Sequence, residues 1–382
     1  MPRPPANASG RTLDGVAFPI YFRSPRGWSD PTLGFAMRRH TILATILIAS
    51  LAACAKEAPK AADTTATVTT AAPAPAAAPP SANAAAESPL APGEARLAVD
   101  GGRIWYRVVG SGSATPAILL HGGPGYSSFY MRSMEALGAD RPVVRYDQLG
   151  AGKSDRMTDT AMFNIAHFVR ELDSLRSHLG YAKIHVVGHS WGTILGLEYY
   201  RTHPEHVASL TLMSSAIDIP TWERNAKRLV KTLPESAQKA IATREAEKKF
   251  DAPDYQAALG EFYGKYVWRR PVQAELDSLT STVNEGIYNY MQGPSEFTIT
   301  GTLKPYNATP FLKNVKVPVL FTVGEFDEAD PATVKKQAQM TPGAKYAVIP
   351  GAAHIVQWDN PDETNRVVRA FLASVDSTRA KP

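Results

Sequence analysis

The stretch Gly188-His189-Ser190-Trp191-Gly192 places a serine between two glycines at a sharp bend in the chain. An apolar run precedes the bend and a run of helical character follows it, so the bend joins a strand to a helix. A turn this tight forces its central residue into strained backbone geometry, and such strain is found mostly at functional sites. The pattern G-x-S-x-G predicts that Ser190 is a nucleophile.

A serine hydroxyl needs a base to take its proton and a carboxylate to orient that base. The acidic cluster "GEFDEAD" and then "PGAAH" follow Ser190, which is the order nucleophile, acid, base that one class of serine enzymes uses. His354 is the only histidine after the cluster, so we expect it to be the base. Asp327 fits a G-x-x-D turn best among the four candidates for the acid, which are Glu325, Asp327, Glu328 and Asp330.

The oxyanion formed in such a reaction needs backbone N–H donors close to the nucleophile. The N–H of Trp191, directly after the serine, is the expected first donor. The loop "HGGPG" at 121–125 should supply the second, because it follows an apolar strand and lacks bulky side chains. Pro124 cannot donate, so Gly122 or Gly123 must.

These residues need a scaffold, and the apolar runs "PAILL", "RPVVRYD", "KIHVVG", "VASLTLM", "VPVLFTVG" and "AKYAVI" supply candidate strands. Helical segments such as 163–179 separate them, which predicts a mostly parallel sheet covered on both faces. Ligands bind such sheets at the carboxyl ends of the strands. The segment 216–316 has helical spacing and many charges, so we interpret it as an inserted α-helical cap, with 96–215 and 317–382 forming the α/β core.

A leader is predicted from Met37 to Cys54, which reads "MRRHTILATILIASLAAC". Two arginines precede a short apolar stretch, and small residues stand before the cysteine, as in a secretory signal. Because "LAAC" resembles a bacterial lipobox, we interpret 37–54 as a lipoprotein signal peptide with Cys54 as the lipidation site. The alternative is a short signal anchor with an incidental cysteine. Residues 1–36 are interpreted as an upstream extension that is not part of the native protein.

Residues 55–95 are rich in Ala, Pro and Thr and hold almost no large apolar side chain, which predicts a disordered tether. The expected location is the periplasmic side of a membrane in the bacterial cell envelope. Ala55 after the cysteine favours the outer membrane, with the lipid as the only membrane attachment. The net charge of +5 on 382 residues is mild and its lysines and arginines are scattered, so no nucleic-acid partner is expected.

Together "HGGPG", "YDQLGAGKSD", "GHSWGT", "GEFDE" and "GAAH" resemble the prolyl iminopeptidase family of α/β-hydrolases, which includes the tricorn-interacting aminopeptidases. The resemblance runs from Arg96 to the C-terminus and includes "MQGPSEFTITGTL" in the cap. It implies an α/β-hydrolase fold, no cofactor and no metal, and release of an N-terminal proline or other small or apolar residue from short peptides with a free N-terminus, through an acyl-enzyme. The implied roles are nucleophile, acid and base for Ser190, Asp327 and His354, oxyanion hole for Gly123 and Trp191, and binding of the substrate's α-ammonium for Glu296 and Glu328.

Two other functions remain open from the residues. An esterase or amino-acid amidase would use the same Ser190, Asp327 and His354. A non-catalytic envelope binding protein on this scaffold would have no need of the complete set. Haloalkane dehalogenases and epoxide hydrolases need an aspartate at the bend, and Ser190 argues against both.

Overall fold

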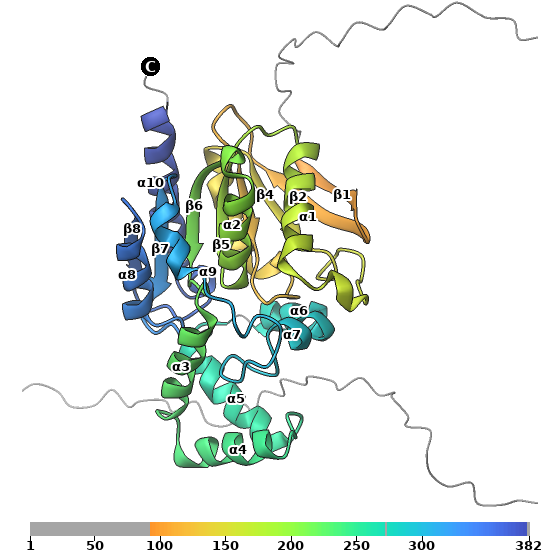
Figure 1. Ribbon diagram of the computed structural model, residues 1–382, viewed down its shortest axis with the longest axis vertical. Coiled ribbons are helices and arrows are strands. Elements are labelled where there is room, and N and C mark those ends of the chain that lie inside the picture. The colour runs from red at the N-terminus through yellow and green to blue at the C-terminus, as the bar shows by residue number, and fades with distance from the viewer. Residues whose placement is uncertain (1–91, 272, 380–382) are drawn as a thin grey trace, which may run out of the picture. The chain divides into compact units, whose positions relative to one another are not determined.

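The computed structural model describes residues 92–271 and 273–379 (Figure 1). The predictions for the leader, for Cys54, for residues 1–36 and for most of the tether lie outside these residues. The first strand begins at Gly93, three residues before Arg96, where the predicted core begins. Within the described residues, no helix is both long and apolar enough to cross a membrane.

An eight-stranded sheet forms the centre of the fold, in the order β1-β2-β4-β3-β5-β6-β7-β8. The pairs β1–β2 and β2–β4 are antiparallel and all the others are parallel. The strands from β3 to β7 are buried along their whole length, which explains their continuous apolar sequences. The strand bounds are Gly93–Val99, Gly102–Val109, Ala117–Leu120, Val143–Asp147, Ile184–His189, Val207–Met213, Val319–Gly324 and Lys345–Ile349.

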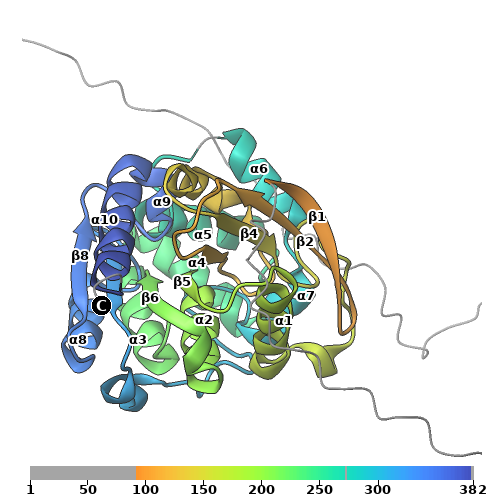
Figure 2. The same cartoon turned by 90° about the horizontal axis from the view of Figure 1, so that it is seen from above.

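Helices cover both faces of this sheet (Figure 2). The side chain of Val186 in β5 faces Gly196 on α2, whereas its neighbour His185 lies 3.1 Å from Asp376 on α10. Because successive side chains of a strand point to opposite faces, α2 and α10 lie on opposite sides of the sheet. The helices outside the cap are α1 (Ile165–His178), α2 (Trp191–Thr202), α8 (Pro331–Met340), α9 (Val356–Asp359) and α10 (Pro361–Arg379).

Five helices between β6 and β7 gather beyond one end of the sheet (Figure 1). They form the inserted cap, so the predicted α/β fold with a helical insertion is confirmed. Their first turns explain where several of them begin, since Asp218 caps α3 and Asn284 caps α7 through side-chain acceptors. The cap helices are α3 (Ile219–Val230), α4 (Glu235–Ala246), α5 (Pro253–Tyr266), α6 (Gln273–Thr282) and α7 (Glu285–Met291).

Strand register brings the predicted site loops together. Leu120 at the end of β3 pairs with Gly188 in β5, so the "HGGPG" loop and the serine bend emerge side by side. Gly324 at the end of β7 pairs with Ile349 at the end of β8, so the acidic cluster and the His354 loop also emerge as neighbours.

Candidate active site

Ser190 stands at the turn between β5 and α2, with a backbone φ of 54° and ψ of −122°. A positive φ is uncommon for a residue that carries a side chain. A Cβ on Gly188 would lie 2.2 Å from the carbonyl oxygen of Gly192, and a Cβ on Gly192 would lie 2.2 Å from that of Leu120. Close backbone contacts therefore require both glycines of the motif, and they hold the serine in a strained conformation.

Asp327 follows β7 and His354 follows β8, and Nδ1 of His354 lies 2.9 Å from Oδ1 of Asp327. The carboxylate also accepts hydrogen bonds from the backbone N–H groups of Gly324 at 3.2 Å and Ala329 at 2.8 Å. Burial raises the pKa of Asp327, but the charge of His354 and these hydrogen bonds outweigh burial and hold the pKa below its ordinary value. An ionised Asp327 keeps the imidazole proton on Nδ1, which leaves Nε2 free to act as a base.

Ser190 and His354 line the same hollow. Within the described residues, the Ser190 hydroxyl makes no hydrogen bond to the imidazole. Such catalytic hydrogen bonds are often long without substrate and shorten in the complex. The structure thus brings the three predicted residues to one place, with the acid–base pair already joined and the serine still separate.

The loop after β3 leaves one backbone N–H unused beside the serine. Gly122 donates its own N–H to the Tyr130 hydroxyl at 2.5 Å, so it is already used. Gly123, with φ of 112°, lines the hollow beside Ser190, and in the part of the chain that the structure describes its N–H has no acceptor. The N–H of Trp191 is likewise unused there, at the start of α2, where the helix dipole favours a negative charge. Of the two glycines left open by the sequence, the geometry favours Gly123.

Two carboxylates, the half-buried Glu296 and the fully buried Glu328, lie close to this point. Glu296, in the loop after α7, accepts a hydrogen bond from the Tyr288 hydroxyl at 2.7 Å, and its other oxygen lies 3.5 Å from the amide nitrogen of Gln292. Glu328 is fully buried, and neither of its oxygens has a hydrogen-bond partner among the described residues. Burial, then the charges of Glu296 and Asp327, raise the pKa of Glu328 well above its usual value, and burial also raises that of Glu296.

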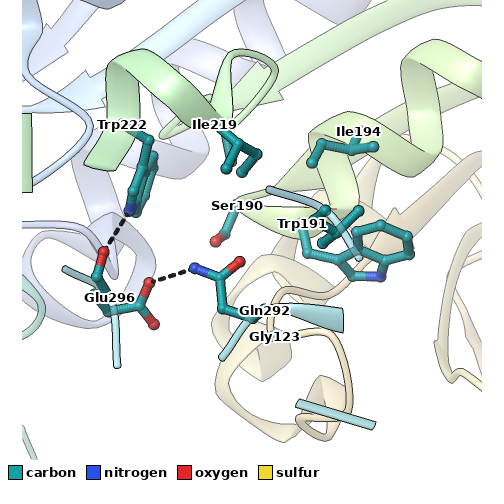
Figure 3. A pocket seen from close by; sticks show the side chains of 10 residues that line it. Gly123, Ser190, Trp191, Ile194, Ile219, Trp222, Gln292 and Glu296 are labelled. Atoms are coloured by element: carbon teal, nitrogen blue, oxygen red, sulfur yellow. Dashed lines mark hydrogen bonds between the residues drawn. The ribbon is translucent and has the colours of Figure 1, made fainter. Parts of the chain in front are cut away.

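Two adjoining hollows, of about 240 and 400 Å³, share Gly123, Ser190 and Glu296 in their walls. Figure 3 shows the Ser190 hydroxyl directed into the smaller hollow, toward Gln292 and Glu296, while the Trp191 ring points away from it. The remaining walls are mostly apolar or aromatic. The smaller hollow adds Trp191, Ile194, Ala216, Ile219, Trp222, Gln292 and Leu303, and the larger adds Gly122, Tyr126, Tyr130, His189, Tyr263, Val267, Trp268, Leu279, His354 and Ile355.

Backbone hydrogen bonds join the end of α5 to the loops that carry the acid and the base. The carbonyl oxygen of Tyr266 accepts from the N–H groups of His354 at 3.1 Å and Glu328 at 3.3 Å. One oxygen of Asp359 accepts from the N–H groups of Arg269 at 2.8 Å and Arg270 at 2.7 Å. The other oxygen of Asp359 accepts from the N–H of Ala353, next to His354, at 2.8 Å. The cap and the base are therefore held as one unit.

Comparison with known proteins places this geometry in a family. The family model of the alpha/beta hydrolase fold matches residues 115–361. The chain is 40% identical over 285 residues to a proline iminopeptidase of Heyndrickxia coagulans, covering 74% of this chain and 99% of that protein. The chain belongs to the proline iminopeptidase family of α/β hydrolases. The fold agrees: the crystal structure of the proline iminopeptidase of Mycobacterium smegmatis has a TM-score of 0.69 at 31% identity, and that of VinJ 0.71 at 30%, each covering 75% of this chain and the whole of the other.

Membership of the proline iminopeptidase family confirms the resemblance drawn from the motifs and makes the protein a serine hydrolase. Within this family site, sequence reasoning missed most of the aromatic lining. Three separate segments supply Tyr126, Trp222 and the pair Tyr263 and Trp268, and no local pattern marks these segments as neighbours. His189, beside the nucleophile, binds the backbone: its Nε2 lies 2.8 Å from the carbonyl oxygen of His354.

The hydrogen bonds of His189 fix its protonation state. Only a ring N–H can bind the carbonyl oxygen of His354, so Nε2 carries the proton and Nδ1 accepts from the Tyr130 hydroxyl at 2.8 Å. Burial, together with the nearby His354, lowers the pKa of His189 to about 3, so this ring is neutral. His189 therefore holds the Tyr130 hydroxyl and the backbone of His354 by hydrogen bonds and carries no charge itself. Over residues 92–271 and 273–379, no group of three or more His, Cys, Asp or Glu side chains is arranged to hold a metal.

Proposed function

We propose that the protein is a serine aminopeptidase that releases an N-terminal proline, or another small or apolar residue, from short peptides through an acyl-enzyme. The single observation that carries the proposal is the carboxylate of Glu328. It is fully buried, it has no hydrogen-bond partner within the described residues, and Glu296 lies near enough for its charge to raise the pKa of Glu328. Burying an unpaired carboxylate is costly, so a site that keeps one is built for a cationic ligand.

The α-ammonium of a peptide is a cation that fits this pair. An N-terminal proline carries a secondary ammonium with two N–H donors, one for each carboxylate, on an apolar ring that suits aromatic walls. Because Glu296 and Ser190 line the same hollows, an amine held there places the carbonyl of the same residue near the serine. The distance from amine to carbonyl is fixed by covalent geometry, so the pair selects cleavage after the first residue.

The reaction then follows from the roles of three side chains and two backbone groups. The Ser190 hydroxyl transfers its proton to Nε2 of His354 as its oxygen attacks the carbonyl carbon, and Asp327 stabilises the imidazolium. The N–H groups of Gly123 and Trp191 bind the oxyanion. As the C–N bond breaks, His354 donates the proton to the departing peptide nitrogen. Water, activated by the same imidazole, hydrolyses the acyl-enzyme and restores the serine.

Arylamide substrates test the proposal directly. We expect the protein to cleave L-proline p-nitroanilide, and to cleave the N-acetylated form at least 100-fold more slowly, because acetylation removes the cation. Ser190→Ala should abolish both activities and so controls for contaminating peptidases. Equal turnover of the free and acetylated substrates would contradict the role of the carboxylate pair.

A second test separates the aminopeptidase from an esterase or amidase, which the family relationship does not favour. An esterase has no use for such a carboxylate pair. We expect Glu296→Ala to lose release of proline from dipeptides and to keep hydrolysis of a simple acetate ester. Equal loss of both reactions would show that Glu296 supports the fold of the site and not the amine.

We also propose that the protein is an exported lipoprotein of the bacterial cell envelope. The support is the sequence "MRRHTILATILIASLAAC", with translation beginning at Met37 and lipidation at Cys54, followed by the tether. Metabolic labelling with a palmitate analogue should mark the wild-type protein in the membrane fraction and leave Cys54→Ser unlabelled. Labelling of both would exclude Cys54 as the lipidated residue, and recovery in the inner-membrane fraction would exclude the favoured outer membrane.

A further inference from the structure

The peptide group between Gly122 and Gly123 carries the N–H assigned above to the oxyanion hole, and its carbonyl oxygen is held from the other side. Nδ1 of His121 lies 2.9 Å from the carbonyl oxygen of Gly122. In a planar trans peptide, the C=O and N–H bonds point in opposite directions. The bond that holds the Gly122 oxygen therefore also sets the direction in which the Gly123 N–H points.

The protonation state of His121 is determined by its neighbours. Its Nε2 lies 3.0 Å from the backbone nitrogen of Gln148, and a backbone N–H can only donate. Nε2 is therefore the acceptor, and Nδ1 carries the proton that binds the Gly122 oxygen. The ring is fully buried, and burial lowers its pKa, so it remains neutral. His121 acts as a fixed donor to the oxyanion loop.

The side chain of Gln148 joins this loop to the second N–H donor. Its amide nitrogen donates to the carbonyl oxygen of His121 at 3.2 Å, and its amide oxygen accepts from the indole N–H of Trp191 at 2.8 Å. The indole can only donate, which fixes which end of the amide faces which partner. Trp191 is the residue whose backbone N–H forms the other half of the oxyanion hole. One buried amide thus contacts both segments that supply the hole.

We propose that Gln148 is a positioning residue that sets the separation and direction of the two oxyanion donors, through His121 on one side and Trp191 on the other. Gln148 is buried, and both ends of its side-chain amide are bound inside the protein, so it acts without touching substrate. The inference rests on the proposed function and adds a specific expectation to it. Loss of Gln148 should weaken binding of the transition state and leave binding of the substrate's amine unchanged.

The test compares the wild type with Gln148→Leu and with Trp191→Phe, which removes the indole N–H and keeps a ring and the backbone donor. With L-proline p-nitroanilide, and with rates expressed per site titrated by a fluorophosphonate, kcat should fall about 10–100-fold while KM stays within about twofold. Two inhibitors separate the steps. Pyrrolidine-2-boronic acid forms a tetrahedral adduct with the serine, and its inhibition constant should rise by the factor lost from kcat. L-Prolinol offers only the amine, and its inhibition constant should not change.

Controls make each outcome decisive. The double variant should be no slower than the worse single one, because both substitutions break the same bridge. Gln337→Leu removes another buried glutamine, on α8, and should keep wild-type kinetics. If Gln148→Leu does not fold, Trp191→Phe carries the test. Wild-type kcat in folded Gln148→Leu, or in Trp191→Phe, or an equal weakening of both inhibitors, overturns the inference. If the wild type itself neither cleaves the arylamide nor binds the boronate, it is the proposed function that fails.

Discussion

Replacing Glu328 with glutamine should make the protein more stable and much less active. The carboxylate is fully buried without a hydrogen-bond partner in the described structure, and Glu296 and Asp327 add like charge. Its pKa is raised in the folded protein, so folding favours the protonated form. The free energy of unfolding therefore falls as the pH rises from the pKa of Glu328 in the unfolded chain to its higher pKa in the folded protein. The decrease is complete only above that higher value.

The structure sets the expected size of both effects. Glutamine keeps the shape and carries no charge at any pH, so the variant escapes the cost of burying a charge beside Glu296 and Asp327, on the order of 1–3 kcal/mol. For a domain of this size that gain corresponds to a rise in Tm on the order of 2–10 °C at pH 8, with a smaller rise at pH 5. Removing one partner of a buried ionic contact to the substrate costs about 3–5 kcal/mol, so kcat/KM for free-amine substrates should fall by about 10²–10⁴-fold.

Thermal unfolding at the two pH values and arylamide kinetics at pH 8 provide the measurements. Glu325→Gln is the matched control, because Glu325 belongs to the same acidic cluster but is exposed and, among the residues that the structure describes, accepts only a backbone N–H from Gly351. That variant should resemble the wild type in both assays. A Glu328→Gln protein that is less stable than the wild type at pH 8, or that keeps its activity on free amines, would refute the reasoning.

Three further results are expected. The kcat/KM for a proline arylamide should rise with pH as Glu328, whose pKa is raised, loses its proton, and Glu328→Gln should lack that rise; a pH–rate profile of both proteins checks this. Tyr130→Phe removes the acceptor of the Gly122 N–H and the partner of His189, so kcat should fall about tenfold with KM nearly constant, as steady-state kinetics would show. Gly192→Ala forces a Cβ to 2.2 Å from a backbone oxygen, so soluble yield or Tm should drop sharply, and an unchanged melting curve would contradict the close contact.

The sequence predicts best those parts of the site that follow a strand directly. Ser190, Asp327 and His354 each stand in a short loop after an apolar run, and parallel strands bring such loops to one edge whatever the rest of the chain does. The order of these residues and the glycines beside them then suggests their roles. The sequence pattern could not show whether Gly122 or Gly123 provides the oxyanion donor, because the answer depends on Tyr130 accepting one of the two N–H groups.

The roles of residues in the cap and in the buried hydrogen-bond network could not be predicted from local sequence patterns. Glu296 was assigned only through family resemblance, since a glutamate in a loop carries no sign of burial. Gln148 directly follows β4, and nothing in the sequence around it indicates that its side chain reaches Trp191, 43 positions along the chain. Contacts of that kind depend on how helices and loops meet in three dimensions, which hydrophobic periodicity does not encode.

The attachment of the cap to the loops of Glu328 and His354 limits what the enzyme can admit. A lid that swung away as a whole would carry off the hydrogen bonds at Tyr266 and Asp359, and with them the placement of the proton acceptor. Substrates are therefore expected to reach Ser190 with the cap in place. The same helices that hold the proton acceptor in place then also line the path of the incoming peptide end, so selection of the substrate and placement of the base depend on one set of contacts.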